Sequence, residues 1–171
     1  MDKQLEIYIE NMEWQIAKMV DGIQQLSDEQ MTWTPAGINN SISWLIGHFA
    51  GVLWECYGLA SGDKIEANLL DSGIPEGWLK NLTFDENAPL PGVSGSERAA
   101  YLQKAWATLK DYLVEHHPDW QSVEVLRPPD QIKSMWWMLH HCLIDAGYHT
   151  GQASYLKMLI AVGADAITRG E

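Results

Sequence analysis

The stretch from Ser41 to Ala60 reads SISWLIGHFAGVLWECYGLA, and a single Glu is its only charged residue. Asn40 or Ser41 can serve as the N-cap of a helix that we expect to run to about Ala60. Apolar side chains cover most of the circumference of this helix, as is typical of a helix buried at the centre of a protein. The stretch therefore predicts the central element of an all-α fold.

Three further segments have the apolar spacing of amphipathic helices. Residues 2–25 carry apolar side chains three and four positions apart, and residues 94–115 and 130–162 are also expected to be helical. Four helices joined in this way predict a four-helix bundle. Without an internal repeat, a low-complexity tract or a linker, residues 1–171 are expected to form one domain.

The connections between these helices are uneven in length. Residues 61–93 are rich in Gly, Pro, Asp and Asn, and we expect a long connection with short helical turns near residues 68–70 and 78–79. Ser27 and Gln30 have the spacing of a capping box, which predicts a short further helix after the first one.

Composition excludes several classes of function. The 171 residues carry a net charge of −12, which disfavours nucleic-acid binding. The apolar runs are too short to span a bilayer, and the acidic start lacks the pattern of a signal peptide. The two Cys residues lie inside predicted helices and have neither disulfide-like nor zinc-knuckle spacing. We expect a cytoplasmic protein without a membrane partner.

The histidines are the most informative chemical feature. His48 lies in the middle of the most apolar helix, where a single His usually satisfies one hydrogen bond in the core. In the last helix, Asp145 is four residues from both His141 and His149 and shares a face with each of them. His141 and His149 lie about 12 Å apart along the axis, which is too far for them to chelate one ion. Either pair needs a further ligand, which His48 can supply.

Two imidazoles and one carboxylate leave positions on a metal open for water or substrate. Bundles commonly build metal sites from side chains that project inward from facing helices. The alternative is a surface Asp–His pair that contributes about a few tenths of a kcal/mol. Spacing alone leaves both interpretations open.

Three short stretches give the chain a family resemblance. Residues 41–50 resemble the second-helix motif of the DinB/YfiT-like superfamily, and residues 149–152, His-Thr-Gly-Gln, resemble the end of its last-helix motif. Residues 26–35 resemble the family's lead-in to the second helix. In element order the similarity covers nearly the whole chain.

The resemblance implies an up-down-down-up four-helix bundle, often a homodimer, with three metal-binding histidines. By position, His48 and His149 match two of these ligands. The third falls on Asp145, where the commoner pattern has His, and His141 remains the alternative. An anionic oxygen ligand allows a working site with Zn, Ni, Mn or Fe, or a site that binds metal weakly.

Characterised members of the family resemble thiol S-transferases that use bacillithiol, mycothiol or glutathione, and some resemble maleylpyruvate isomerases. The resemblance implies a metal-dependent enzyme that acts on a low-molecular-weight thiol and a small-molecule substrate. Gln152 is expected to contact ligand or substrate, and Trp44 either walls the pocket or packs in the core. The alternative is a non-catalytic metal or small-ligand binding protein with a degenerate site.

Overall fold

A computed structural model describes most of the chain. The described residues are 2–35, 40–62, 94–116, 119–127 and 131–163. The short helical turns expected near residues 68–70 and 78–79 lie outside the described residues.

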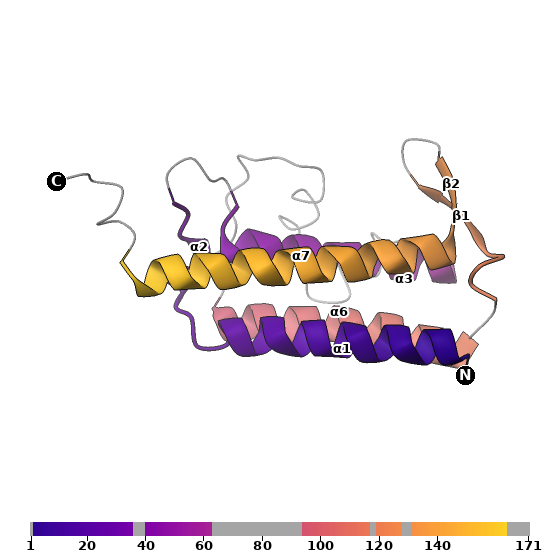
Figure 1. Cartoon of the computed structure of the whole chain (residues 1–171), viewed down its shortest axis with the longest axis horizontal. Helices are drawn as coiled ribbons and strands as arrows, with labels where there is room; N and C mark the ends of the chain where they lie inside the picture. The colour runs from indigo at the N-terminus through magenta and orange to yellow at the C-terminus, as the bar shows by residue number, and fades with distance from the viewer. Residues whose placement is uncertain (1, 36–39, 63–93, 117–118, 128–130, 164–171) are drawn as a thin grey trace.

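Within the described residues, four long helices form a bundle (Figure 1). They are α1 (Lys3–Ile23), α3 (Ile42–Ser61), α6 (Gly95–His116) and α7 (Met135–Ala161), and a short helix, α2 (Asp28–Thr32), precedes α3. Helices α1 and α7 run in one direction, whereas α3 and α6 run in the other (Figure 1). The predicted all-α, up-down-down-up four-helix bundle is thereby confirmed.

Each long helix packs against two neighbours. Helices α1 and α3 both contact α6 on one side and α7 on the other, so α1 and α3 lie diagonally across the bundle. The neighbours α3 and α7 are antiparallel (Figure 1). This arrangement brings the predicted ligands of the second and last long helices to one shared seam.

Local capping explains where several helices begin and end. The predicted capping box is present, because the Ser27 hydroxyl accepts from the backbone N–H of Gln30 while the Gln30 side chain accepts from the N–H of Ser27. Of the two candidates for α3, Ser41 is the N-cap, and its hydroxyl accepts from the N–H of Trp44 at 3.1 Å. Gly62 ends α3 with a φ of +76°, a left-handed conformation that favours glycine.

The predicted start of the last helix is wrong. In place of helix from residue 130, strands β1 (Glu124–Arg127) and β2 (Gln131–Ser134) pair antiparallel, and α7 begins only at Met135. Ser134 ends β2 and caps α7, because its hydroxyl accepts from the N–H of Trp137 at 3.1 Å. The pairing of the two strands satisfies backbone groups that a first helical turn would leave without intrahelical partners.

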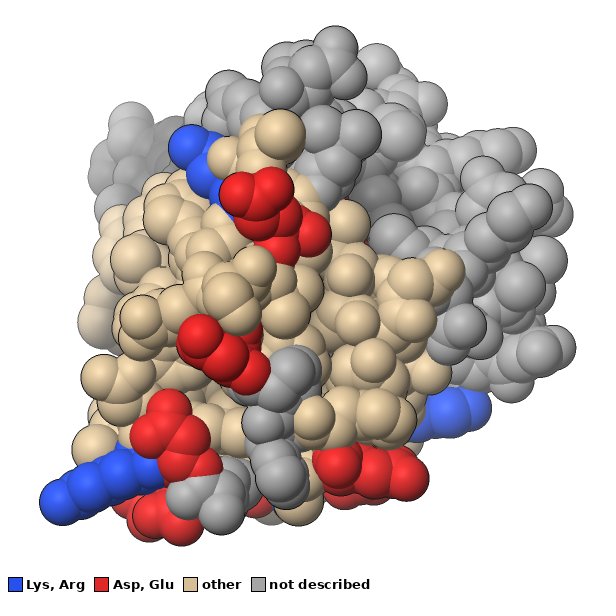
Figure 2. Space-filling view, turned by 90° about the vertical axis from the view of Figure 1, so that its right-hand side faces the viewer, with Lys and Arg blue, Asp and Glu red and all other residues tan. Residues whose placement is uncertain are grey.

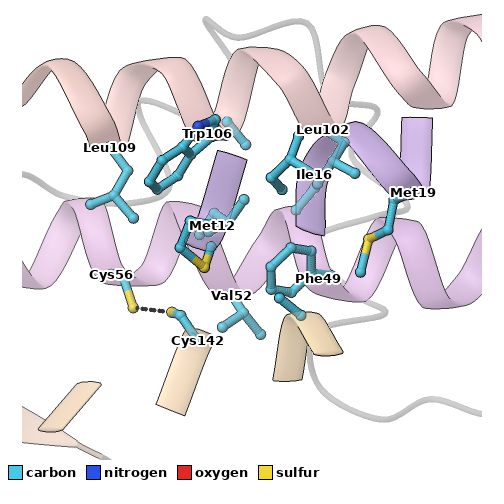
Figure 3. Close-up of a cluster of buried hydrophobic side chains, with 14 of the residues drawn as sticks. Met12, Ile16, Met19, Phe49, Val52, Cys56, Leu102, Trp106, Leu109 and Cys142 are labelled. Atoms are coloured by element: carbon cyan, nitrogen blue, oxygen red, sulfur yellow. Dashed lines mark hydrogen bonds between the residues drawn. The ribbon is translucent and has the colours of Figure 1, made fainter. Parts of the chain in front are cut away.

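Side chains from all four long helices meet in one apolar core (Figure 3). Met12 of α1, Phe49 of α3, Leu102 of α6 and Leu139 of α7 are all fully buried. Burying one such side chain stabilises the fold by about 1.5–3 kcal/mol relative to leaving it exposed. The core holds the helices at the positions on which the site depends.

The surface reflects the acidic composition. Figure 2 looks at the end of the bundle where α1 begins, and several carboxylates lie on this face, with a few Lys or Arg side chains near its edges. None of the helices in the described ranges is long and apolar enough to cross a membrane.

Candidate metal centre

His48 lies midway along α3, on the side that faces α7. Trp44, one turn earlier, stacks flat against the imidazole, with ring centroids 4.9 Å apart and planes 5° apart. Both side chains are half-buried. The stacked indole limits how the imidazole can turn, so His48 presents a defined edge to the neighbouring helix.

His149 approaches His48 from α7. The two imidazole centroids lie 5.2 Å apart, with ring planes at 83°. His149 is buried, and its Nδ1 lies 2.8 Å from Oε1 of Gln152, one turn later on the same helix. An amide oxygen only accepts hydrogen bonds, so Nδ1 carries a proton that it donates to Gln152. In this tautomer the lone pair of the imidazole is on Nε2, the atom with which His149 would bind a metal.

The surroundings of His48 lower the pKa of its imidazole and so favour the neutral form. Burial is the main cause that lowers its pKa, and the proximity of His149 lowers the pKa further. The negative charge of Asp145 acts in the opposite direction, whereas His141 adds a small lowering effect. Because only a neutral imidazole can coordinate a metal, this environment favours the form of His48 that binds one.

Asp145 lies one turn before His149 on α7 and is within electrostatic range of His48. Its Oδ2 is 3.3 Å from Nε2 of His141, and both side chains are partly exposed. His141 in turn stacks on Trp137, with centroids 5.2 Å apart and planes 10° apart. The two residues that the sequence offers as alternative third ligands therefore pair with each other.

Two of the three predicted ligands are arranged as a divalent metal ion would require. His48 and His149 converge from different helices, and Gln152 orients one of them as a protein oxygen commonly orients a metal-binding histidine. Asp145 has suitable chemistry, but its carboxylate interacts with His141. Within the described ranges, no group of three or more His, Cys, Asp or Glu side chains is gathered closely enough to hold a metal ion. A third ligand would require the carboxylate to turn away from His141 or to be shared with it.

A comparison with protein families places this geometry in context. A family model described as the DinB superfamily matches residues 11–153, a range that includes both convergent histidines. The chain belongs to the DinB superfamily. No curated protein matches the chain. Membership confirms the resemblance that residues 26–35, 41–50 and 149–152 indicate. The match to the DinB superfamily identifies no activity or metal.

A second polar pair on the same seam was missed by sequence reasoning. Cys56 of α3 and Cys142 of α7 face each other, with their sulfur atoms 2.8 Å apart. Cys56 follows His48 by eight residues, whereas Cys142 precedes His149 by seven. In antiparallel helices these spacings bring the two thiols to one level once His48 and His149 are placed opposite each other. The sequence signal that could have predicted this pair is the combination of the His48–Cys56 and Cys142–His149 spacings.

Proposed function

We propose that this member of the DinB superfamily binds one divalent metal ion between α3 and α7. His48, His149 and Asp145 would be its protein ligands, with Zn, Ni, Mn or Fe as candidate ions. The approach of the His48 and His149 rings to 5.2 Å, from two different helices, is the observation that carries the proposal. The lowered pKa of His48 and the hydrogen bond from His149 to Gln152 support it.

We further propose that the site activates a low-molecular-weight thiol for transfer to an electrophilic small molecule. When bound, a divalent ion would lower the pKa of the thiol and stabilise the thiolate, which is the nucleophilic form. We propose a cytoplasmic setting, because reduced thiols are kept abundant there.

The side chains of the site would bind and orient the reactants. Gln152 would hold the proton on Nδ1 of His149, which leaves Nε2 available to bind the ion. Trp44 would fix His48 by stacking and supply an apolar wall. Asp145 would contribute a negative charge, which lowers the net charge of the loaded site relative to three histidines.

A non-catalytic binding protein is the second candidate function. The pairing of Asp145 with His141 favours it, because that pairing leaves two converged ligands in place of three. Such a site would bind metal more weakly than a complete one and would lack the thiol-activating chemistry.

The first experiment measures metal content. Wild-type protein, prepared without a metal-binding tag and reconstituted with each of the four ions, is expected to carry about one ion per chain. His48→Ala and His149→Ala should lose it, whereas His140→Ala, an exposed histidine on α7, should keep it. Circular dichroism would verify that the variants fold. A wild type that retains none of the four ions would contradict the proposal.

A thiol-consumption assay separates the two candidate functions. Glutathione or bacillithiol would be mixed with monochlorobimane and the metal-loaded protein. Turnover that disappears in both His48→Ala and His149→Ala supports the transferase. Stoichiometric metal binding without turnover across a panel of thiols and electrophiles supports the binding protein.

We also propose that the chain is a homodimer that associates through the outward face of α7. Large apolar side chains recur on this face at Trp137, Ile144, Tyr148 and Tyr155, and their spacings of seven and four residues place them in one stripe. Asp145 is the only acidic residue of α7. Two copies with a net charge of −12 would repel each other least along such a face.

A further inference from the structure

The thiols of Cys56 and Cys142 form a contact between α3 and α7 inside the core (Figure 3). Their sulfur atoms lie 2.8 Å apart, and neither residue has measurable exposure to solvent. Both are free cysteines. Met12 and Val52 of the apolar core lie close to the pair (Figure 3). The two thiols therefore have each other as their nearest reactive partner.

The pair lies on the same seam as the two imidazoles. Eight residues of α3 separate His48 from Cys56, which is about 12 Å along the helix axis. Seven residues of α7 separate Cys142 from His149, which is about 10 Å. A covalent link between the thiols would therefore join the same two helices that carry the histidines, about two helical turns away.

The environment of the Cys142 thiol favours its protonated form. The hydrogen bond with Cys56 is the first cause that raises the pKa of the Cys142 thiol well above its ordinary value, and burial is the second. Tyr8, which is buried beside the pair, also has a raised pKa, first through burial and then through the two thiols. A protonated thiol is a poor nucleophile, so any oxidation of this pair is slow and needs a small oxidant.

We propose that Cys56 and Cys142 form a redox pair that closes, upon exposure to hydrogen peroxide, into a disulfide joining α3 to α7. One sulfur attacks the peroxide O–O bond, which gives a sulfenic acid and one molecule of water. The second sulfur attacks the sulfenic sulfur, forms the S–S bond and releases a second water. Two thiols lose two electrons and two protons in total, and hydrogen peroxide is reduced to two waters.

The disulfide would stabilise the bundle. It would link residues 86 positions apart, and a cross-link over so long a segment restricts the unfolded chain strongly. For a chain of this size we expect the melting temperature to rise by about 10 °C. The inference goes beyond the proposed metal site, because bond formation and melting temperature are both measured on metal-free protein.

The test compares oxidised and reduced wild-type protein with two single variants. Metal-free protein is incubated with hydrogen peroxide, denatured in the presence of an alkylating agent and digested without reductant. We expect a cross-linked peptide pair that contains Cys56 and Cys142, disappears on reduction and accompanies the higher melting temperature. Cys56→Ala and Cys142→Ala should each keep one alkylatable thiol and show no such rise.

Three results would overturn the proposal. In the first, both thiols of the wild type can still be alkylated after prolonged oxidation. In the second, either cysteine is oxidised to a sulfinic or sulfonic acid and no cross-link forms. In the third, the disulfide joins two different chains. Because the wild type serves as its own reduced control, the test does not depend on the folding of either variant.

Discussion

Helices α1 and α7 lie side by side and run in the same direction, yet they differ in how their surfaces are used. On α1, Met12 and Ile16 are buried, while Glu6, Glu10 and Glu13 are exposed. The exposed part of α1 also includes Ile7 and Trp14, but it is far richer in charge than that of α7. On α7, one side is buried in the core, whereas the outward side also carries large apolar residues. Helix α1 is thus amphipathic, whereas α7 is apolar on two sides.

This difference indicates which helices of such a bundle can carry a binding site or an interface. An amphipathic helix has one packing partner, the core, and water on its other side. Helix α7 holds His149 and Cys142 on its inner side, Asp145 and His141 at the boundary, and an apolar stripe outside. We therefore expect changes in α1 to alter stability, and changes in α7 to alter ligand binding or assembly.

The largest effect is expected from Met12→Ala in α1. Met12 is fully buried, and removing its side chain leaves a cavity that costs about 2–5 kcal/mol of the free energy of unfolding. Urea unfolding at fixed protein concentration measures this loss. The number of metal ions per folded chain should not change. If the free energy of unfolding falls by less than about 1 kcal/mol, or if the folded variant loses its metal, then α1 and α7 do not differ in the way proposed.

A smaller effect is expected from Gln152→Ala in α7. Without the acceptor on Nδ1, His149 loses its fixed orientation, and we expect metal affinity to fall about 10–100-fold. Titration against a chelator of known affinity measures the change. Gln152→Glu keeps an oxygen acceptor and should restore most of the affinity, whereas Ser154→Ala, an exposed neighbour on α7, should behave as wild type. Equal affinity in Gln152→Ala and wild type would show that the hydrogen bond is irrelevant to binding.

The smallest effect is expected from Tyr155→Asp on the outward face of α7. Tyr155 is 52% exposed, so the fold should tolerate the change within about 0.5 kcal/mol. A charge within the apolar stripe should weaken dimer formation about tenfold. Sedimentation velocity over a range of concentrations measures the dimer dissociation constant. Val114→Asp places the same charge at an exposed apolar position of α6 and serves as the matched control. A monomeric wild type, or equal weakening by both variants, would argue against this interface.

The helices of this fold are predictable from sequence because their signals are local. The capping box of Ser27 and Gln30 and the cap at Ser41 depend on residues three positions apart, and apolar spacing depends on one helical turn. The hairpin of β1 and β2 was missed because its stability comes from pairing between two segments of four residues each. Neither segment has a strong pattern of its own.

The candidate site was predictable only in part, for a similar reason. The approach of His48 and His149 follows from their family motifs and from the antiparallel packing of their helices. Spacing gives the position of Asp145 on α7 but not the side-chain rotamer, and His141 competes for the carboxylate. Whether the Asp145 carboxylate interacts with His141 or with a metal depends on local solvation and charge, and helical periodicity does not predict these.

Ser134 is both the last residue of β2 and the N-cap of α7, so strand register and helix phase are set by the same residue. A slip of one residue in the hairpin would move the cap to a neighbouring position and turn the helix by about 100°. His149 lies fifteen residues further on, about 22 Å along the axis, and such a turn would carry its ring away from α3. The register of two strands of four residues each therefore determines whether the imidazole of His149 points toward α3.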